Sequence, residues 1–302
     1  MKARLMKQDR KIQIIAYIVL GFLTFSALLP FILLIIVSFT DNSATIVNGY
    51  SFLPEKFSLS AYQYILGEWQ LLGRAYGITI FVAAFGTLVS IIITSMLAYA
   101  LSHENLPGKN ILVFLVILTM LFNGGLVSTY FIYSNVLHIK NTIWAQIVPY
   151  LLMNGFNVIL VKNYFTFSIP KTLTEAANLD GANEFQIFTQ IMMPLSTPIL
   201  VTVGLMSCIA YWNDWTNGLY FLSGLEGAKY YNIQNILNQI NQNISFLANN
   251  STRGFAGTNV SQLPTNTILM AMAVVAIIPI VATYPFFMKY FVKGITVGAV
   301  KE

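Results

Sequence analysis

Charged side chains are scarce in this 302-residue chain, in which Asp, Glu, Lys and Arg together make up 9% of the residues. A soluble domain carries roughly 25%, so these charges are too few to cover a surface that faces water. Hydrophobic residues instead make up 56% of the chain. The composition therefore excludes an ordinary soluble protein and predicts a chain that is largely embedded in lipid.

Cysteine is nearly absent too, since the chain contains only Cys208. A single cysteine excludes an internal disulfide and a zinc cluster built from this chain alone, and we expect no bound metal. The sequence also lacks a G-x-x-x-x-G-K-[ST] phosphate loop, an H-E-x-x-H motif and a nucleophile elbow. The net charge of +5 comes without a basic stripe interleaved with aromatics, so we expect no nucleic-acid partner. The chain is thus predicted to be neither an ATPase nor another enzyme.

What the sequence does contain is six long apolar runs. Each has the roughly 20 residues that a helix needs to cross about 30 Å of hydrocarbon, and each must be helical because lipid cannot pair with free backbone groups. The runs lie near 12–39, 75–101, 111–134, 142–165, 194–222 and 265–291. The sequence therefore predicts an all-α integral membrane protein with six transmembrane helices, made of an amino-terminal segment at 1–11 and a six-span domain at 12–302.

The distribution of Lys and Arg predicts the orientation. With the amino terminus inside, eleven of the 16 basic residues fall on the cytoplasmic side, as the positive-inside rule requires. Both termini are then cytoplasmic, and the long connections are an inner loop at 166–193 and outer loops at 40–74 and 223–264. We expect a short interfacial helix in the first outer loop. The second is rich in Asn and Gln, which suits either a solvated loop or a contact with another protein.

The inner loop contains the most informative segment, IPKTLTEAANLDGANEFQIFTQIMMPLSTP, at 169–198. Thr172 and Glu175 have the spacing of a capping box, which predicts a new helix beginning about one residue after Thr172. Gly181 would end that helix after two turns. A second helical run is expected to begin near Asn183 and to end before Pro194, where the fifth span begins. Such an amphipathic helix-turn-helix either lies on lipid headgroups or offers a contact to another protein, and its spacing alone leaves both open.

Glu175-Ala-Ala, then Gly181, then Ile191-Met-Met-Pro resemble the EAA signature of binding-protein-dependent ABC importer permeases. That pattern is EAA, three residues, G, nine residues and I-x-L-P. Met193 here replaces the usual Leu, a change of similar volume. GTLVSIIITSMLAYALSHENLPGKN and the tail YPFFMKYFVKGITVGAVKE also resemble the carbohydrate branch, in particular the second permease of oligosaccharide systems. The resemblance implies the ABC type I importer permease fold.

In that family the EAA loop is a coupling helix that sits in a cleft of the ATPase subunit. The resemblance implies that the contact here is made by Glu175, Ala176, Ala177, Asp180 and Gly181. Glu175 would face a basic residue of the ATPase or serve only as a capping partner. The implied partners are a second homologous permease, two ATPase subunits that bind ATP and Mg²⁺, and an extracytoplasmic solute-binding protein. The chain itself is expected to bind no cofactor.

Charge is almost absent within the predicted spans, with Asp214 in AYWNDWTNGLYF as the exception. An ionisable group in a membrane segment usually faces a water-filled cavity or a protein partner, and aromatic rings beside Asn and Asp suit the passage of a sugar. The alternative is an aromatic belt at the outer interface. The candidate substrate-path residues are Tyr211, Trp212, Asn213, Asp214, Trp215, Asn217 and Tyr220.

We therefore expect the permease subunit of an ATP-driven importer for oligosaccharides, spanning the bacterial cytoplasmic membrane. An ion-coupled secondary sugar transporter is the alternative, but it should carry several intramembrane acids or broken helices, and only Asp214 fits. The branch that the chain resembles often serves plant or algal polysaccharide fragments, including uronides. The sequence shows no obvious cluster of inward-facing Lys or Arg that would hold their carboxylates.

Overall fold

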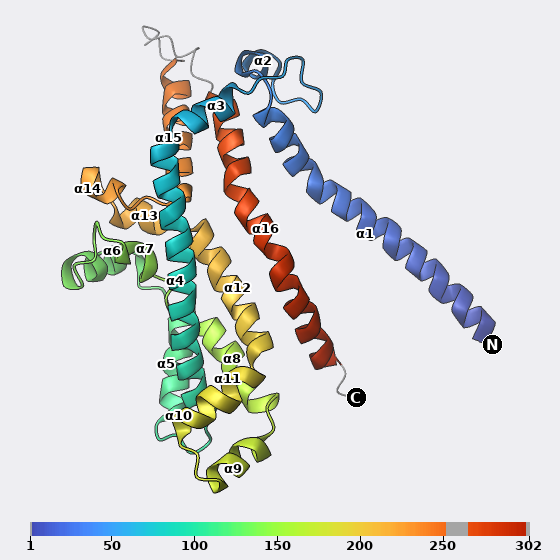
Figure 1. Ribbon diagram of the computed structural model, residues 1–302, viewed down its shortest axis with the longest axis vertical. Helices are drawn as coiled ribbons and strands as arrows, with labels where there is room; N and C mark the ends of the chain where they lie inside the picture. Colours follow the sequence, from blue (N-terminus) through green and yellow to red (C-terminus); the bar gives the residue numbers. More distant parts are fainter. Residues whose placement is uncertain (1, 252–264, 300–302) are drawn as a thin grey trace. The chain divides into compact units, whose positions relative to one another are not determined.

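The computed structural model describes residues 2–251 and 265–299 (Figure 1). Within these residues every regular element is a helix, apart from one isolated antiparallel bridge between Thr40 and Phe57. The all-α class predicted from the apolar runs is therefore confirmed for the described part of the chain. Residues 252–264, which end the second predicted outer loop, lie outside it.

Three helices are long and apolar enough to cross a membrane by themselves. They are α1 (Lys2–Ser38), α4 (Trp69–Ser102) and α16 (Thr265–Ala299). Two further candidates are sharply bent pairs of helices. Residues 109–121 and 125–136 meet at 117°, and residues 184–195 and 197–213 meet at 79°. The described residues thus contain three to five candidate spans by length and composition, and the six-span topology with its orientation stays a prediction.

The predicted span at 142–165 differs most from the structure. It is divided between α7 (Trp144–Ile147) and α8 (Gly155–Phe167). Asn154 separates them because its side chain accepts hydrogen bonds from the backbone N–H groups of Phe156 at 2.9 Å and Asn157 at 3.3 Å. This is N-capping geometry, which starts a helix at Gly155. With 13 residues, α8 is shorter than the roughly 20 residues of a full crossing.

The chain divides into two compact units, 1–69 with 239–278 and 70–238 with 279–302. In the first unit, the predicted outer loop at 40–74 contains two short helices, α2 (Asn42–Asn48) and α3 (Ser60–Gly67). Phe39, just after α1, stacks on Tyr62 of α3 at 4.7 Å between ring centroids, and Ser38 Oγ lies 2.8 Å from the Tyr62 hydroxyl. The expected short helix in this loop is thus present, together with a second one.

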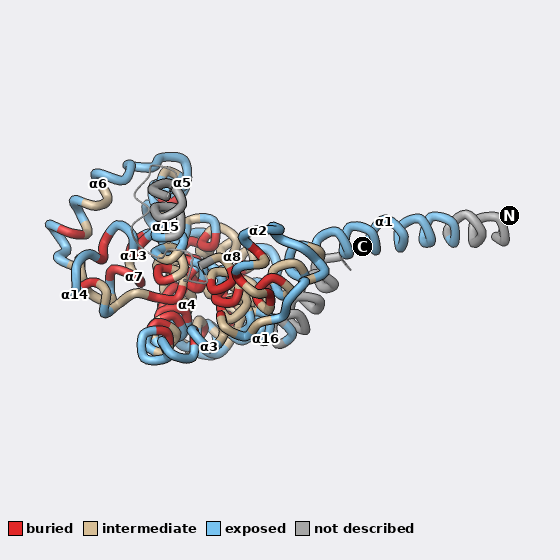
Figure 2. The backbone as a smooth tube through the Cα atoms, turned by 90° about the horizontal axis from the view of Figure 1, so that it is seen from above, coloured by how far each residue is buried: buried red, intermediate tan, exposed pale blue. Residues whose placement is uncertain are grey.

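In the second unit, α4 packs closely on α12 (Thr197–Asn213) through small residues. A Cβ at Gly86 of α4 would lie 2.6 Å from the ring of Tyr211, and a Cβ at Gly204 of α12 would lie 2.8 Å from Ile91. Figure 2 shows buried positions gathered along α4. Small residues let membrane helices approach closely, and that approach replaces the hydrophobic driving force that lipid does not supply.

The remaining helices of this unit are shorter. They are α5 (Lys109–Leu121), α6 (Gly125–Phe131), η1 (Ile132–Val136), α9 (Lys171–Leu179), α10 (Glu184–Gln186), η2 (Ile187–Met192), α11 (Met193–Leu195), α13 (Thr216–Phe221) and α14 (Gly224–Ala228). The segments η1 and η2 are π-helical. A nineteen-residue helix, α15 (Ile233–Ser251), begins in this unit and occupies a region that was expected to be a loop.

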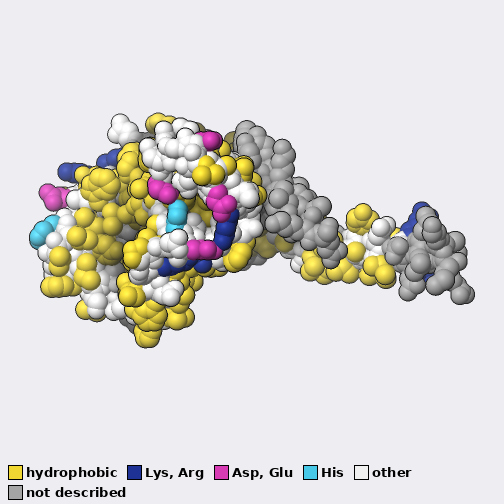
Figure 3. Space-filling model, turned by 90° about the horizontal axis from the view of Figure 1, so that it is seen from below, with side chains coloured by type: hydrophobic (Ala, Val, Ile, Leu, Met, Phe, Trp, Pro, Cys, Tyr) yellow, Lys and Arg dark blue, Asp and Glu magenta, His cyan; other side chains and the backbone are white. Residues whose placement is uncertain are grey.

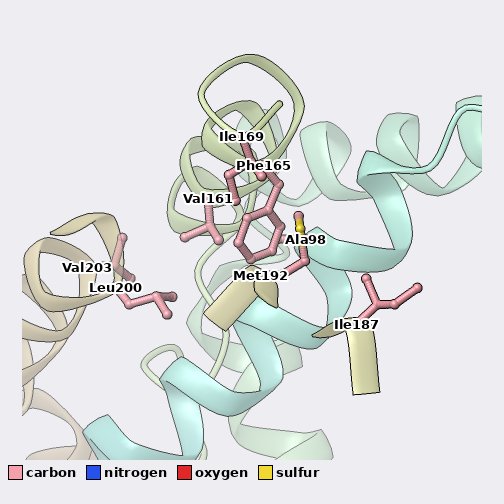
Figure 4. Packing of buried hydrophobic residues seen from close by; sticks show 8 residues of the cluster. All are labelled: Ala98, Val161, Phe165, Ile169, Ile187, Met192, Leu200 and Val203. Atoms are coloured by element: carbon pink, nitrogen blue, oxygen red, sulfur yellow. The ribbon is translucent and has the colours of Figure 1, made fainter. Parts of the chain in front are cut away.

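A hydrophobic cluster supports the lower end of this unit, as Figure 1 is drawn. It joins α4, α8, η2 and α12 (Figure 4), and its buried members are Ala98, Val161, Phe165, Ile169, Ile187, Met192, Leu200 and Val203. The predicted second helical run of the inner loop is α10, η2 and α11 together. It continues through Pro194 and ends at the 79° bend, where Ser196 separates it from α12. The loop at 166–193 is therefore packed against α4, α8 and α12 through this cluster.

Candidate functional site

The segment with the EAA pattern forms a short exposed helix, α9, at the lower end of the second unit in Figure 1. The predicted capping box of Thr172 and Glu175 is wrong, because α9 begins at Lys171 with Pro170 as its N-cap residue and no side-chain cap. Pro170 has the extended backbone of an N-cap residue, with φ of −62° and ψ of 127°. Glu175 is therefore left without a capping role, which removes one of the two alternatives weighed for it.

The turn after α9 is a Schellman motif centred on Gly181. The N–H of Ala182 donates to the Ala177 carbonyl at 3.0 Å, and the N–H of Gly181 donates to Asn178 O at 3.1 Å. Gly181 has φ of +82°, a left-handed conformation that glycine adopts without penalty. The predicted break at Gly181 is thus confirmed, with Asp180 as the C-cap residue of α9.

A true capping box follows directly after this turn. Asn183 Oδ1 accepts from the N–H of Gln186 at 2.9 Å, and Gln186 Oε1 accepts from the N–H of Asn183 at 2.9 Å. The predicted start of the second run near Asn183 is confirmed. Because both ends of the turn are closed by specific hydrogen bonds, the angle between α9 and α10 is defined by local sequence.

The surface of this loop is unusually apolar for a segment outside the packed core. Leu179 is 89% exposed and Phe185 is 72% exposed, and the neighbouring Leu173 is exposed as well. Four of the five predicted coupling residues, Glu175, Ala176, Asp180 and Gly181, are exposed, whereas Ala177 packs against the hydrophobic cluster. Exposed apolar groups of this kind mark a surface for another protein or for lipid.

Charged side chains surround a cavity of about 260 Å³ between the end of α4 and the inner loop. Figure 3 shows acidic, basic and histidine side chains gathered on this face. Lys171 of α9 pairs with Glu104, which follows α4, and this hydrogen bond lowers the pKa of the Glu104 carboxyl below its usual range. Glu184 of α10 accepts a hydrogen bond from the Tyr99 hydroxyl at 2.6 Å and lies 3.3 Å from His103 Nε2. The loop is thus tied to α4 at two points.

The seven candidate substrate-path residues divide into a buried and an exposed group. Tyr211 and Trp212 are buried in α12, and Tyr211 donates its hydroxyl hydrogen to the Ile147 carbonyl at 2.9 Å. Asn217 is buried and donates to Pro149 O at 3.0 Å. Asp214 completes the buried group. The exposed members are Asn213, Trp215 and Tyr220.

Asp214 is the C-cap residue of α12, and its side chain accepts hydrogen bonds at the start of α13. Its Oδ1 accepts from the N–H groups of Thr216 at 3.0 Å and Asn217 at 3.2 Å, and from the Thr216 hydroxyl at 2.7 Å. Its Oδ2 is buried without a hydrogen-bond partner in the described residues, as is Oδ1 of Asn217. Buried acceptors normally have a hydrogen-bond partner. A further donor that reached this region could therefore form a hydrogen bond with either of these two oxygens.

Sequence reasoning missed a buried amide network beside this region. Gln146 Nε2 donates to Asn235 Oδ1 at 2.9 Å, and Asn232 Nδ2 donates to Gln146 Oε1 at 2.9 Å and to the Asp214 carbonyl at 2.6 Å. All three amide side chains are buried. In the sequence, Asn232 and Asn235 were marked only by the Asn-rich composition of 223–264, which also fits a solvated loop. The network instead joins the start of α15 to α7.

Comparisons with known proteins cover nearly the whole chain. The family described as "Binding-protein-dependent transport system inner membrane component" matches residues 108–297. The chain is 37% identical over 287 residues to the polygalacturonan/rhamnogalacturonan transport system permease protein YtcP of Bacillus subtilis (strain 168), covering 94% of this chain and 97% of that protein. It is 34% identical over 295 residues to protein LplC of the same organism, covering 98% and 96%.

One solved structure has a similar fold over the same length. It is the crystal structure of a bacterial ABC transporter involved in the import of the acidic polysaccharide alginate, with a TM-score of 0.77 and 29% identity. The match covers 94% of this chain and 98% of that chain. The similarity therefore extends well beyond the EAA motif and over nearly the whole chain.

Proposed function

The chain belongs to the family of binding-protein-dependent transport system inner membrane components, and from this premise we propose that it is the permease subunit of an ATP-driven oligosaccharide importer. It would lie in the bacterial cytoplasmic membrane beside a second, homologous permease. Two ATPase subunits would bind ATP and Mg²⁺, and an extracytoplasmic binding protein would deliver the sugar. In this account the chain provides the path and the coupling contact, and performs no hydrolysis.

The observation that carries this proposal is the exposed loop from α9 to α10. Ala176 and Gly181 are small and leave the backbone accessible, while Leu179 and Phe185 offer large apolar side chains beside them. A protein surface that received this loop would bury those side chains, at about 25 cal/mol for each Å² of apolar area. Because the loop is tied to α4 and stands on the hydrophobic cluster, movement of its partner would be transmitted to the membrane helices.

The coupling contact would use Glu175, Ala176, Ala177, Asp180 and Gly181. Their roles differ, because Ala177 is half-buried against the hydrophobic cluster and the others are exposed. Ala177 would hold α9 on its base, and Glu175, which caps nothing in α9, would face a cation of the ATPase. Gly181 would set the direction of the turn.

For the substrate we infer an oligosaccharide that carries uronic acid groups. One relative with a long match is named as a polygalacturonan/rhamnogalacturonan permease, and the similar solved structure is of an importer of the acidic polysaccharide alginate. Asn213, Trp215 and Tyr220 are exposed and would line the path, with rings that stack on sugar faces. Tyr211, Trp212, Asp214 and Asn217 are buried and would form the wall behind them.

Reconstitution tests this function against the ion-coupled alternative. The assembled complex would be placed in liposomes with its binding protein outside, and uptake of radiolabelled trigalacturonate would be measured. The proposal predicts uptake that requires internal Mg–ATP and is unchanged when proton and sodium gradients are collapsed. Uptake driven by a gradient without ATP would contradict it. A neutral trisaccharide of the same length tests the uronate inference separately, since equal uptake of both would remove that inference alone.

A further inference from the structure

His103 and Glu184 bring together two segments that lie far apart in sequence. Glu184 opens α10 of the inner loop, whereas His103 follows directly after α4. The Tyr99 hydroxyl donates to Glu184 Oε2 at 2.6 Å across a separation of 85 residues, and His103 Nε2 lies 3.3 Å from the same oxygen. The Tyr99 ring also packs edge-on against the His103 imidazole, at 4.6 Å between ring centroids, and lies tilted against the Phe188 ring at 5.1 Å. Oε2 of Glu184 in the loop therefore contacts both Tyr99 of α4 and His103 directly after it.

The hydrogen positions at this point follow from the partners of the imidazole. His103 Nδ1 lies 2.9 Å from the backbone carbonyl oxygen of Tyr99. A carbonyl oxygen can only accept, so Nδ1 carries a hydrogen. In the neutral imidazole Nε2 then carries no hydrogen, and its lone pair faces the carboxylate of Glu184. Only a second proton, on Nε2, turns this repulsive approach into a charge-assisted hydrogen bond.

The charged groups around the imidazole lie on α5, α9 and α10 and in the turn after α4. Lys109, at the start of α5, donates to the His103 carbonyl at 2.9 Å and opposes a positive charge there. Glu184 of α10 and Glu175 of α9, which lines the same cavity, favour that charge. Glu104 and Lys171 pair with each other and largely cancel. The arrangement therefore contains a net excess of acidic groups on the side of the inner loop.

We propose that His103 is a positioning residue whose protonation fastens the α9–α10 loop to the end of α4. With the imidazole protonated, Glu184 has both a phenol and an imidazolium as donors, and the loop is held against α4. As the pH rises and the second proton leaves, the Nε2–Glu184 bond is lost and only the Tyr99 hydroxyl remains. An attachment that needs this proton would respond to pH.

The expected size of the effect follows from exposure. The side chains of His103 and Glu184 are 40% and 64% exposed, and ion pairs at such sites change an equilibrium by about two- to fivefold. The consequence for transport rests on the proposed function, because only a loop that carries movement from an ATPase makes its attachment to α4 matter. The attachment itself can be measured without that assumption.

Spin labels on either side of the cavity measure the attachment directly. Cysteines would replace Asn105 and Asn178, which are exposed and line the cavity, in a Cys208→Ala chain assembled with its partners in nanodiscs. Electron–electron distances would be recorded from pH 6 to pH 8.5. We expect the population at short distance to fall about two- to fivefold as the pH rises. An unchanged distribution over this range would overturn the proposal.

Three variants of the labelled chain separate protonation from general damage. His103→Gln should remove the pH dependence, whereas Tyr99→Phe should lower the short-distance population at every pH and keep the dependence. Glu226→Gln, an equally conservative change at an exposed carboxylate of α14, should behave as the parent does. A pH dependence that survives in His103→Gln would overturn the assignment to His103.

Hydrolysis of Mg–ATP by the same complexes, without sugar, connects the attachment to coupling. We expect His103→Gln to raise this futile hydrolysis at pH 6 to the level that the parent shows at pH 8. If the label distances respond to pH as expected while hydrolysis is the same for all variants, the attachment stands and the proposed coupling role of the loop is wrong. If neither responds, the attachment itself is wrong.

Discussion

Gly181 is the residue on which the geometry of the inner loop depends most directly. Its φ of +82° is left-handed, and a Cβ added there would meet no atom within 4 Å. The cost of a substitution is therefore backbone strain and not a clash. That strain is roughly 1–2 kcal/mol for ordinary L residues, and it is larger for β-branched residues than for Asn, which tolerates the left-handed region.

We predict that Gly181→Val uncouples hydrolysis from transport, because the strained turn would redirect α9 relative to α10. The complex should assemble, hydrolyse ATP and import several-fold less trigalacturonate for each ATP consumed. Gly181→Asn is the matched control and should retain most of the coupling. Uptake and phosphate release measured in the same liposomes give the ratio, and equal ratios for the two variants would show that the turn conformation does not matter.

For single residues, the sequence predicted the turn at Gly181 correctly and the capping box of Thr172 and Glu175 incorrectly. Gly181 and Asn183 were identified because a left-handed glycine and the start of a new helical run are local features, and local hydrogen bonds in the structure satisfy both. Thr172 and Glu175 have the right spacing too, but Pro170 begins the helix earlier and places both inside it. Spacing alone does not tell which of two neighbouring residues opens a helix.

Among the elements, the packing of α4 against α12 gives the clearest prediction for stability. A methyl group at Gly86 would lie 2.6 Å from the Tyr211 ring, whose hydroxyl is held by the Ile147 carbonyl at 2.9 Å. The ring cannot yield without losing that bond, so Gly86→Ala should destabilise the protein by about 1–3 kcal/mol. Gly77→Ala, in the same helix with open space around it, should be neutral or slightly stabilising. Thermal unfolding in detergent compares them, and equal midpoints would contradict this packing.

The predicted elements were correct where an apolar run is uninterrupted and incorrect where the run is bent or divided. Hydropathy located α1, α4 and α16, although Pro279 and Pro285 lie within α16. It did not predict the 117° bend between α5 and α6 or the short α8 that Asn154 caps. Hydropathy averages over many residues and is insensitive to a single capping amide, so the breaks were invisible to it.

For the assembled molecule, the predicted second outer loop at 223–264 offers a prediction about the proposed binding protein. The structure makes its first part a buried network around Asn232 and Asn235, whereas Gln239, Gln242 and Asn243 of α15 are exposed. Lysine at the three exposed positions should reduce the stimulation of ATP hydrolysis by the binding protein several-fold, because bulky charge would be placed in the interface. Leu53→Lys, at an exposed position of the other outer loop, is the control. Equal stimulation in both variants would contradict an interface at α15.

If α9 is the part of this chain that binds a nucleotide-binding subunit, a crosslinker at position 176 should reach that subunit. A photoreactive amino acid would replace the exposed Ala176 in the complete transporter, and the products formed on illumination would be identified by mass spectrometry. We predict a crosslink to the nucleotide-binding subunit whose yield changes when Mg–ATP is added. Crosslinks only to lipid, or only to the extracytoplasmic binding protein, would contradict it.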